Sequence, residues 1–140
     1  MVGDLLASSM IAHGVTGLIL DAGCRDITDL IKMGFPVWSR AISAKGTIKA
    51  TLGQVNTPVI CAGAMANPGD VVVADDDGVV IVPFAEVETA IAKSEMRIAK
   101  EAAKRARLKA GELGIDIENM RPWLEKLGIS YIDSADDPQR

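Results

Sequence analysis

The sequence is poor in the residue types on which several common sites depend. Its 140 residues include one histidine, His13, and two cysteines, Cys24 and Cys61. A single histidine excludes His-rich zinc sites and disfavours a Ser-His-Asp triad. Two cysteines are too few for a disulfide scaffold or a four-cysteine metal site. One disulfide between them stays open, and two reduced thiols are the simpler expectation.

Aromatic residues and positive charge are also scarce. Aromatic residues make up 4% of the chain, and its net charge at pH 7 is −4. The chain therefore has little excess positive charge to neutralise phosphates and few aromatic rings to stack on bases, and we expect no nucleic-acid partner. No run approaches the roughly 18 apolar residues of a membrane helix, and no signal-peptide pattern opens the chain. A cytoplasmic protein without a membrane partner is the expectation.

The residues that are present have the composition of an ordinary globular domain, at 49% hydrophobic and 24% charged. The first forty residues predict alternating elements. These are a helix over 5–11 ended by Gly14, a strand over 15–20, a loop over 21–26, a helix from Asp26 to Gly34 and a strand over 36–41. This order indicates the α/β class.

The remainder of the chain is predicted to be first β-rich and then helical. Short apolar runs at 48–52, 58–61, 71–74 and 79–82 predict a β-rich block, with a hairpin turn at 75–78. A long helix is predicted over 86–113, and its apolar stripe is thin enough to favour packing on another subunit or exposure to solvent. A short helix around Trp123 and an extended piece over 129–132 follow. We therefore expect a core over 1–83, a helical extension over 84–133 and a flexible tail over 134–140.

The strongest chemical signal is a charged cluster at the end of the first predicted strand, where α/β sheets form their sites. It comprises Asp21, Arg25 and Asp26. Arg25 can hold a carboxylate through two parallel hydrogen bonds, and Asp26 can hold a divalent cation. In the alternative interpretation, Asp26 only caps the next helix and Arg25 pairs with a nearby acid.

A second signal is the predicted helix start at Gly3-Asp4. Free backbone N–H groups there suit an anion, and Gly3 lets a ligand approach the backbone. Asp4 would cap the helix or orient a water on a metal ion. Asp75, Asp76 and Asp77 lack the spacing of a calcium loop and are expected to form a solvated turn.

Several ordered motifs carry a family resemblance over nearly the whole chain. They are 3-GDLLA-7, 17-GLILDAGCRD-26, 34-GFPVWSR-40, 55-VNTPV-59, 67-NPGD-70 and 74-ADDDGVV-80. Together they resemble the 4-hydroxy-4-methyl-2-oxoglutarate / 4-carboxy-4-hydroxy-2-oxoadipate aldolases, which share a fold with the regulator of ribonuclease activity A proteins. The resemblance implies a layered β/β/α swivelling-type domain with a long C-terminal helical extension.

The resemblance also implies an activity. These enzymes are class II pyruvate aldolases that use Mg²⁺ or Mn²⁺ to cleave 4-hydroxy-2-oxo dicarboxylic or tricarboxylic acids to pyruvate and a second oxo acid, in aromatic compound catabolism. Many also decarboxylate oxaloacetate. Enolate charge in such a reaction needs fixed positive neighbours. A homotrimer or homohexamer with sites at subunit interfaces is expected.

The resemblance assigns roles residue by residue. Asp26 matches the metal ligand, and Arg25 matches the arginine that contacts the substrate oxygen and the enolate. Asp4 matches an acid that orients a water on the metal. The amides of Leu5 and Leu6 match the donors to the pyruvate carboxylate. Glu101 falls where the family places a glutamate that reaches into a neighbouring subunit's site.

The sequence departs from the family pattern at its start, because the motif that begins at Gly3 normally follows a substantial N-terminal segment. Two alternatives to an active aldolase therefore stay open. One is a non-catalytic binding protein of the ribonuclease-regulator type, and the other is an inactive fragment of the aldolase.

Overall fold

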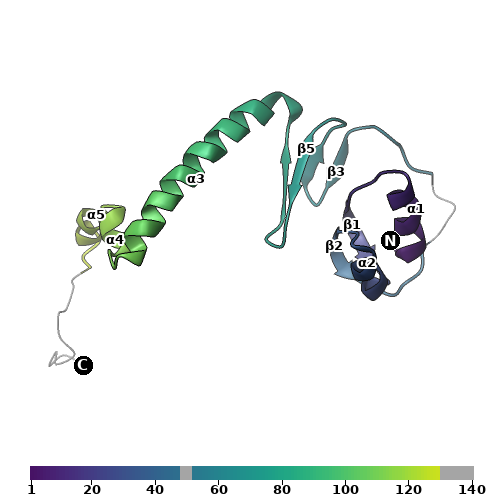
Figure 1. Ribbon diagram of the computed structural model, residues 1–140, viewed down its shortest axis with the longest axis horizontal. Helices are drawn as coiled ribbons and strands as arrows, with labels where there is room; N and C mark the ends of the chain where they lie inside the picture. Colours follow the sequence, from purple (N-terminus) through teal and green to yellow (C-terminus); the bar gives the residue numbers. More distant parts are fainter. Residues whose placement is uncertain (48–51, 130–140) are drawn as a thin grey trace. The chain divides into compact units, whose positions relative to one another are not determined.

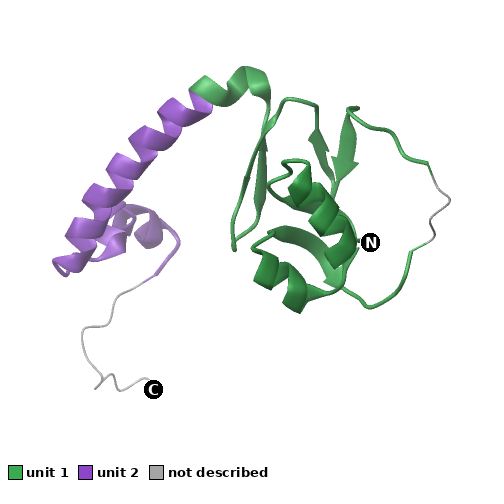
Figure 2. Ribbon diagram, turned by 45° about the vertical axis from the view of Figure 1, so that its right-hand side comes forward, with its two compact units in different colours: residues 1–88 green, residues 89–140 purple. Residues whose placement is uncertain are grey.

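The computed structural model describes residues 1–47 and 52–129. Two compact units make up the chain, the first over 1–88 and the second over 89–140 (Figure 2). The first unit contains all the strands of the described residues and the motifs singled out around Gly3 and Arg25.

The first unit begins with a helix followed by a β-α-β unit (Figure 1). Its elements are α1 (Asp4–Ala12), β1 (Leu18–Cys24), α2 (Ile27–Met33) and β2 (Val37–Ile42). The two strands pair in parallel, which the intervening helix permits. The expected α/β order is confirmed, and Gly34 ends α2 in the left-handed conformation (φ 65°).

The bounds of the first strand were predicted wrongly. The apolar run suggested a strand over 15–20 and a loop over 21–26, whereas β1 runs from Leu18 to Cys24. Residues Gly23 and Cys24 pair with Ala41 and Ile42 of β2, after an irregularity in the register between Leu20 and Gly23. The partner strand therefore extends β1 through polar and small residues that hydropathy alone assigns to a loop.

A small apolar core fixes the helices on one face of this β1–β2 pair. Ala7 of α1, Cys24 of β1, Leu30 of α2 and Phe35 are buried and cluster together. Leu18 and Val37 pack against them from the two strands. Because strand residues alternate between faces, Ile19 and Trp38 belong to the opposite face of the pair.

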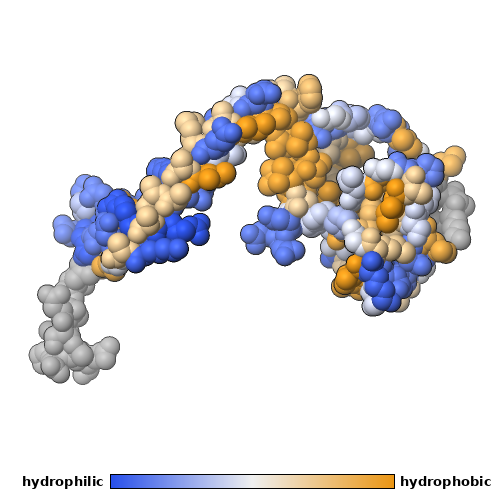
Figure 3. Space-filling view, in the orientation of Figure 1, coloured by the Kyte–Doolittle hydropathy of each residue, from blue (hydrophilic) through white to orange (hydrophobic). Residues whose placement is uncertain are grey.

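Two antiparallel hairpins complete the β-rich block. They pair β3 (Val59–Cys61) with β4 (Ala64–Ala66), and β5 (Val71–Ala74) with β6 (Val79–Val82). The second hairpin confirms the prediction, whereas β4 is a strand that the sequence did not indicate. The predicted strand over 48–52 lies almost wholly outside the described residues. Exposed valines gather on the β5–β6 hairpin, where Figure 3 shows a hydrophobic surface.

A single turn of 3₁₀ helix (Phe84–Glu86) leads into the long helix α3 (Val87–Lys109), which continues into the second unit. The helix is shorter than the predicted 86–113, because Gly111 adopts a positive φ of 92° and the chain turns there. Helices α4 (Gly114–Ile117) and α5 (Arg121–Lys126) follow. No residue of α3 is buried. None of the helices in the described residues has the length and hydropathy needed to cross a bilayer.

Candidate functional site

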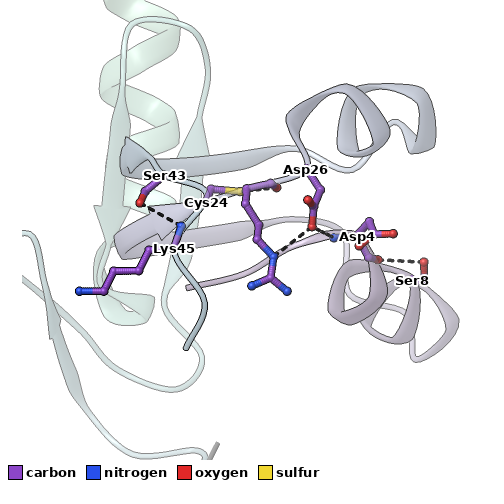
Figure 4. Close-up of polar contacts among 7 residues, drawn as sticks. Asp4, Ser8, Cys24, Asp26, Ser43 and Lys45 are labelled. Atoms are coloured by element: carbon purple, nitrogen blue, oxygen red, sulfur yellow. Dashed lines mark hydrogen bonds and ion pairs between the residues drawn. The ribbon is translucent and has the colours of Figure 1, made fainter. Parts of the chain in front are cut away.

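The start of α1 is held beside the end of β1 by a short stretch of backbone pairing. Val2 forms a parallel bridge with Cys24. The amide of Val2 donates to the carbonyl of Gly23 at 3.4 Å, and the amide of Arg25 donates to the carbonyl of Val2 at 2.9 Å. The first turn of α1 therefore lies next to the residues that follow β1 (Figure 4).

Asp26 links these two segments through one carboxylate oxygen. Its Oδ2 accepts a hydrogen bond from the amide of Asp4 at 3.3 Å and one from Arg25 Nε at 3.2 Å (Figure 4). Both charged side chains are only partly exposed, at 38% for Arg25 and 33% for Asp26. The alternative in which Arg25 pairs with a nearby acid is therefore realised, with Asp26 as that acid.

The expected capping pattern is wrong in one respect. Asp26 occupies the N-cap position of α2, yet its side chain does not cap that helix. Its backbone is left-handed (φ 58°), which aspartate tolerates better than most residues. That turn directs the carboxylate to α1 instead. Gly3, not Asp4, is the N-cap residue of α1, and Asp4 forms no side-chain cap.

Gly3 makes this close approach possible. A Cβ atom added to Gly3 would lie 2.2 Å from Asp26 Oδ2 and 2.9 Å from Arg25 Nε, both inside contact distance. Its φ of −147° is open to any residue, so glycine is needed for space and not for backbone freedom. The sequence signal for this role was the glycine directly before the helix, which we assigned to ligand approach.

The amides of Leu5 and Leu6 lie in the first turn of α1, where an α-helix leaves its N–H groups without intrahelical acceptors. The side chains of these residues are exposed, at 80% and 48%. Together with the partial positive charge of a helix start and the Arg25 guanidinium, this end of α1 favours an anion.

Asp21 does not join the cluster in which the sequence placed it. Its Oδ1 pairs with Arg40 Nε at 2.7 Å, and its Oδ2 accepts a hydrogen bond from the amide of Ala62 at 3.2 Å. The prediction failed because residues 21–24 continue β1, so Asp21 lies within the strand and not in the loop after it.

The remaining polar candidates have structural contacts. His13 Nδ1 lies 2.7 Å from the carbonyl of Ser9 at the end of α1. Asp75 Oδ1 accepts from the amides of Asp77 and Gly78, so the three aspartates form the predicted turn.

Both cysteines are free thiols. Burial raises the pKa of the Cys24 thiol, so it is protonated at neutral pH and unsuited to be a nucleophile.

A divalent cation at this site would have few protein ligands. Within residues 1–47 and 52–129, no three His, Cys, Asp or Glu side chains lie together in a way that could hold a metal. Asp26 Oδ1 accepts no hydrogen bond from the described residues, which leaves a hard oxygen ligand available. Mg²⁺ commonly binds through one or two carboxylates and keeps several waters, so Asp26 fits such an ion.

Glu101 lies on α3 in the second unit. Its carboxylate pairs with Arg97 Nε at 2.7 Å, one helical turn away. The glutamate is exposed, as are Arg97 and Lys100 on the same helix. Its predicted reach into a neighbouring subunit's site stays a prediction.

Comparison with known proteins places this geometry in a family. The family model described as RraA-like, Aldolase/RraA, matches residues 1–81, which include Gly3, Arg25 and Asp26. The chain belongs to the RraA-like family. The predicted fold class is thereby confirmed, because solved RraA-like structures share it.

Relatives of this RraA-like chain carry aldolase names. A protein of Halalkalibacterium halodurans named "Putative 4-hydroxy-4-methyl-2-oxoglutarate aldolase" is 28% identical over 127 residues, covering 91% of this chain and 58% of that protein. A protein of the same name from Pseudomonas fluorescens is 34% identical over 83 residues, covering 59% of this chain and 51% of its own length. The chain thus spans just over half the length of these relatives.

Two solved structures resemble the fold. An uncharacterized protein from Pseudomonas syringae matches with a TM-score of 0.71 at 26% identity, over 79% of this chain and 56% of its own. Streptomyces coelicolor RraAS2, described as an unusual member of the RNase ES inhibitor RraA protein family, matches with a TM-score of 0.68 at 29% identity, over 75% of this chain and 54% of its own.

Proposed function

We propose that the first unit carries the substrate-binding part of a metal-dependent pyruvate aldolase site. The observation that supports this most directly is the convergence of Arg25, Asp26 and the start of α1, held by hydrogen bonds of 3.2 and 3.3 Å to one carboxylate oxygen. The substrate class is a 4-hydroxy-2-oxo dicarboxylic or tricarboxylic acid, such as those in the aldolase names.

The chain's own residues would bind the 2-oxo acid end of the substrate. The amides of Leu5 and Leu6 and the helix dipole bind its carboxylate. Asp26 Oδ1 would hold Mg²⁺ or Mn²⁺, which when bound polarises the C2 carbonyl. Arg25 donates Nε to Asp26, and its terminal nitrogens would contact the substrate oxygen that becomes an enolate.

The reaction balances without a redox partner. A base removes the proton of the C4 hydroxyl, C4 becomes a carbonyl, and the electrons of the C3–C4 bond pass into the pyruvate enolate. A proton at C3 then gives pyruvate. Asp4 at the start of α1, and Glu101 from another copy of the chain in a trimer or hexamer, are the carboxylates proposed to handle these protons.

Alanine variants of the two central residues test the proposal. We expect Arg25→Ala and Asp26→Ala each to abolish pyruvate release while the circular dichroism spectrum is kept. Lys32→Ala is the matched control, since it removes an exposed cation of α2 whose ion pair, among the described residues, is with Asp29. Equal turnover in Asp26→Ala and Lys32→Ala would overturn the ligand assignment.

A second candidate function rests on one comparison. The RraAS2 structure, described as belonging to an RNase inhibitor family, matches the fold at a TM-score of 0.68. A protein of that kind would bind a ribonuclease without chemistry. Stoichiometric, ribonuclease-specific binding by a chain with no activity on oxo acids would favour it.

A further inference from the structure

The first unit contains a cavity that the candidate site does not use. It is partly open to solvent and has a volume of about 330 Å³ on the face of the β1–β2 pair opposite the helices. Its apolar walls include Ile19 of β1, Trp38 of β2 and Ile81 of β6. Arg40 and Asp21 also line it. Neither Arg25 nor Asp26 contributes to this cavity.

The arginine of the cavity makes one ion pair, and 69% of its side chain is exposed. Arg40 Nε pairs with Asp21 Oδ1 at 2.7 Å, while the other oxygen of Asp21 accepts the amide hydrogen of Ala62. Both oxygens of the aspartate are therefore engaged. The terminal guanidinium nitrogens of Arg40 have no partner in the described part of the chain. A guanidinium with two terminal nitrogens available suits a planar carboxylate.

The aromatic wall is anchored by a hydrogen bond. Trp38 Nε1 donates a hydrogen bond to the carbonyl of Asp75 at 2.7 Å, which ties the indole ring to the turn of the β5–β6 hairpin. A ring whose polar atom is already satisfied presents only its apolar surface to the cavity. Such a surface favours another flat ring over a flexible chain.

We propose that this cavity binds a small aromatic carboxylate. Its carboxylate pairs with the terminal nitrogens of Arg40, and its ring lies against Trp38 and Ile81. The volume is near the lower end of the roughly 300–1,000 Å³ typical of ligand pockets, so the ligand has one ring. Because Asp21 already balances the charge of Arg40, the carboxylate alone binds weakly and the ring supplies much of the affinity.

Tryptophan fluorescence of the whole chain gives the test. The chain has two tryptophans, so Trp123→Phe leaves Trp38 as the reporter. We expect benzoate to quench Trp38 saturably, and benzamide and acetate to bind at least about tenfold more weakly, because each lacks one half of the ligand. The absence of saturable quenching by benzoate, or equal affinity for benzamide, would overturn the proposal.

Two arginine variants in the same background locate the ligand. Arg40→Gln should weaken benzoate binding at least about tenfold. Arg25→Gln, which removes the same group from the candidate aldolase site, should leave it unchanged. The proposal is wrong if benzoate binding depends on Arg25 instead, or on neither arginine. Should Arg40→Gln fail to fold, the comparison of benzoate with benzamide still decides.

Discussion

Replacing Gly3 by alanine separates the geometry of the candidate site from the stability of the fold. The added Cβ would lie 2.2 Å from Asp26 Oδ2, so that oxygen must move by roughly 1 Å to reach ordinary contact distance. The atoms in conflict are the ends of partly exposed side chains that can rotate away. The free energy of unfolding should therefore fall by less than about 1 kcal/mol.

The same displacement should have a large effect on ligand binding. Moving the carboxylate shifts the atom that would hold the cation and breaks its hydrogen bond to Arg25, and a misplacement of about 1 Å commonly costs about a hundredfold. Titration calorimetry of oxalate, an analogue of the pyruvate enolate, in the presence of Mg²⁺ measures this loss. Thermal unfolding followed by circular dichroism measures the stability.

Gly46→Ala is the matched control, because its added Cβ meets no atom of residues 1–47 and 52–129 within 4 Å. We expect the control to bind Mg²⁺ and oxalate as the unchanged chain does. Equal binding by Gly3→Ala and Gly46→Ala would refute the reasoning, since the close approach at Gly3 would then have no part in the site.

Three further substitutions test other parts of the account. Asp26→Asn keeps a residue that tolerates the left-handed backbone (φ 58°) at this position. The free energy of unfolding should therefore change by no more than about 1 kcal/mol, while calorimetry shows Mg²⁺ binding lost. Retained Mg²⁺ binding would contradict the assignment. Leu30→Ala removes a core side chain and should lower the free energy of unfolding, measured by denaturant titration, by about 2–5 kcal/mol. The same substitution at exposed Ile31 should cost about 0.5 kcal/mol. Equal effects of the two substitutions would contradict the assigned core. Hydrogen bonds from the amides of Asn67 and Phe84 lower the pKa of Asp70 from its ordinary 3.8. The ionised Asp70 therefore stabilises the fold above pH 3.8. This stabilisation is lost as the pH falls through the lowered pKa of the folded state. The gap in melting temperature between the unchanged chain and Asp70→Asn should accordingly close toward pH 2, and a constant gap would exclude this cause.

The parts of the fold that the sequence predicted well depend on local signals. Apolar periodicity and a terminal glycine defined α2, and a turn rich in aspartate defined the β5–β6 hairpin. Each signal acts within a few residues, so no knowledge of the partner elements was needed.

The errors came from contacts between distant residues. The continuation of β1 through Cys24 depends on pairing with β2, and the placement of Asp21 depends on Arg40 and Ala62. The strand β4 has three residues, too few for a periodicity signal.

In the candidate site too, local features could be predicted from the sequence and contacts between distant residues could not. The adjacency of Arg25 and Asp26 is visible in the sequence, and so is the glycine before the first helix. That the Asp26 carboxylate accepts the amide of Asp4, 22 residues away, is not visible. It follows from the left-handed turn at Asp26 and from the bridge between Val2 and Cys24, both of which need the three-dimensional structure.

Pyruvate release is the most direct test of the proposed aldolase. It would be followed with 4-hydroxy-4-methyl-2-oxoglutarate and with oxaloacetate, in Mg²⁺ and then in excess chelator. The rate with metal alone must be subtracted, because free divalent ions also decarboxylate oxaloacetate. The account predicts release above this background that the chelator abolishes and that Arg25→Ala lacks. Release that survives the chelator, or no release from either substrate, would contradict it.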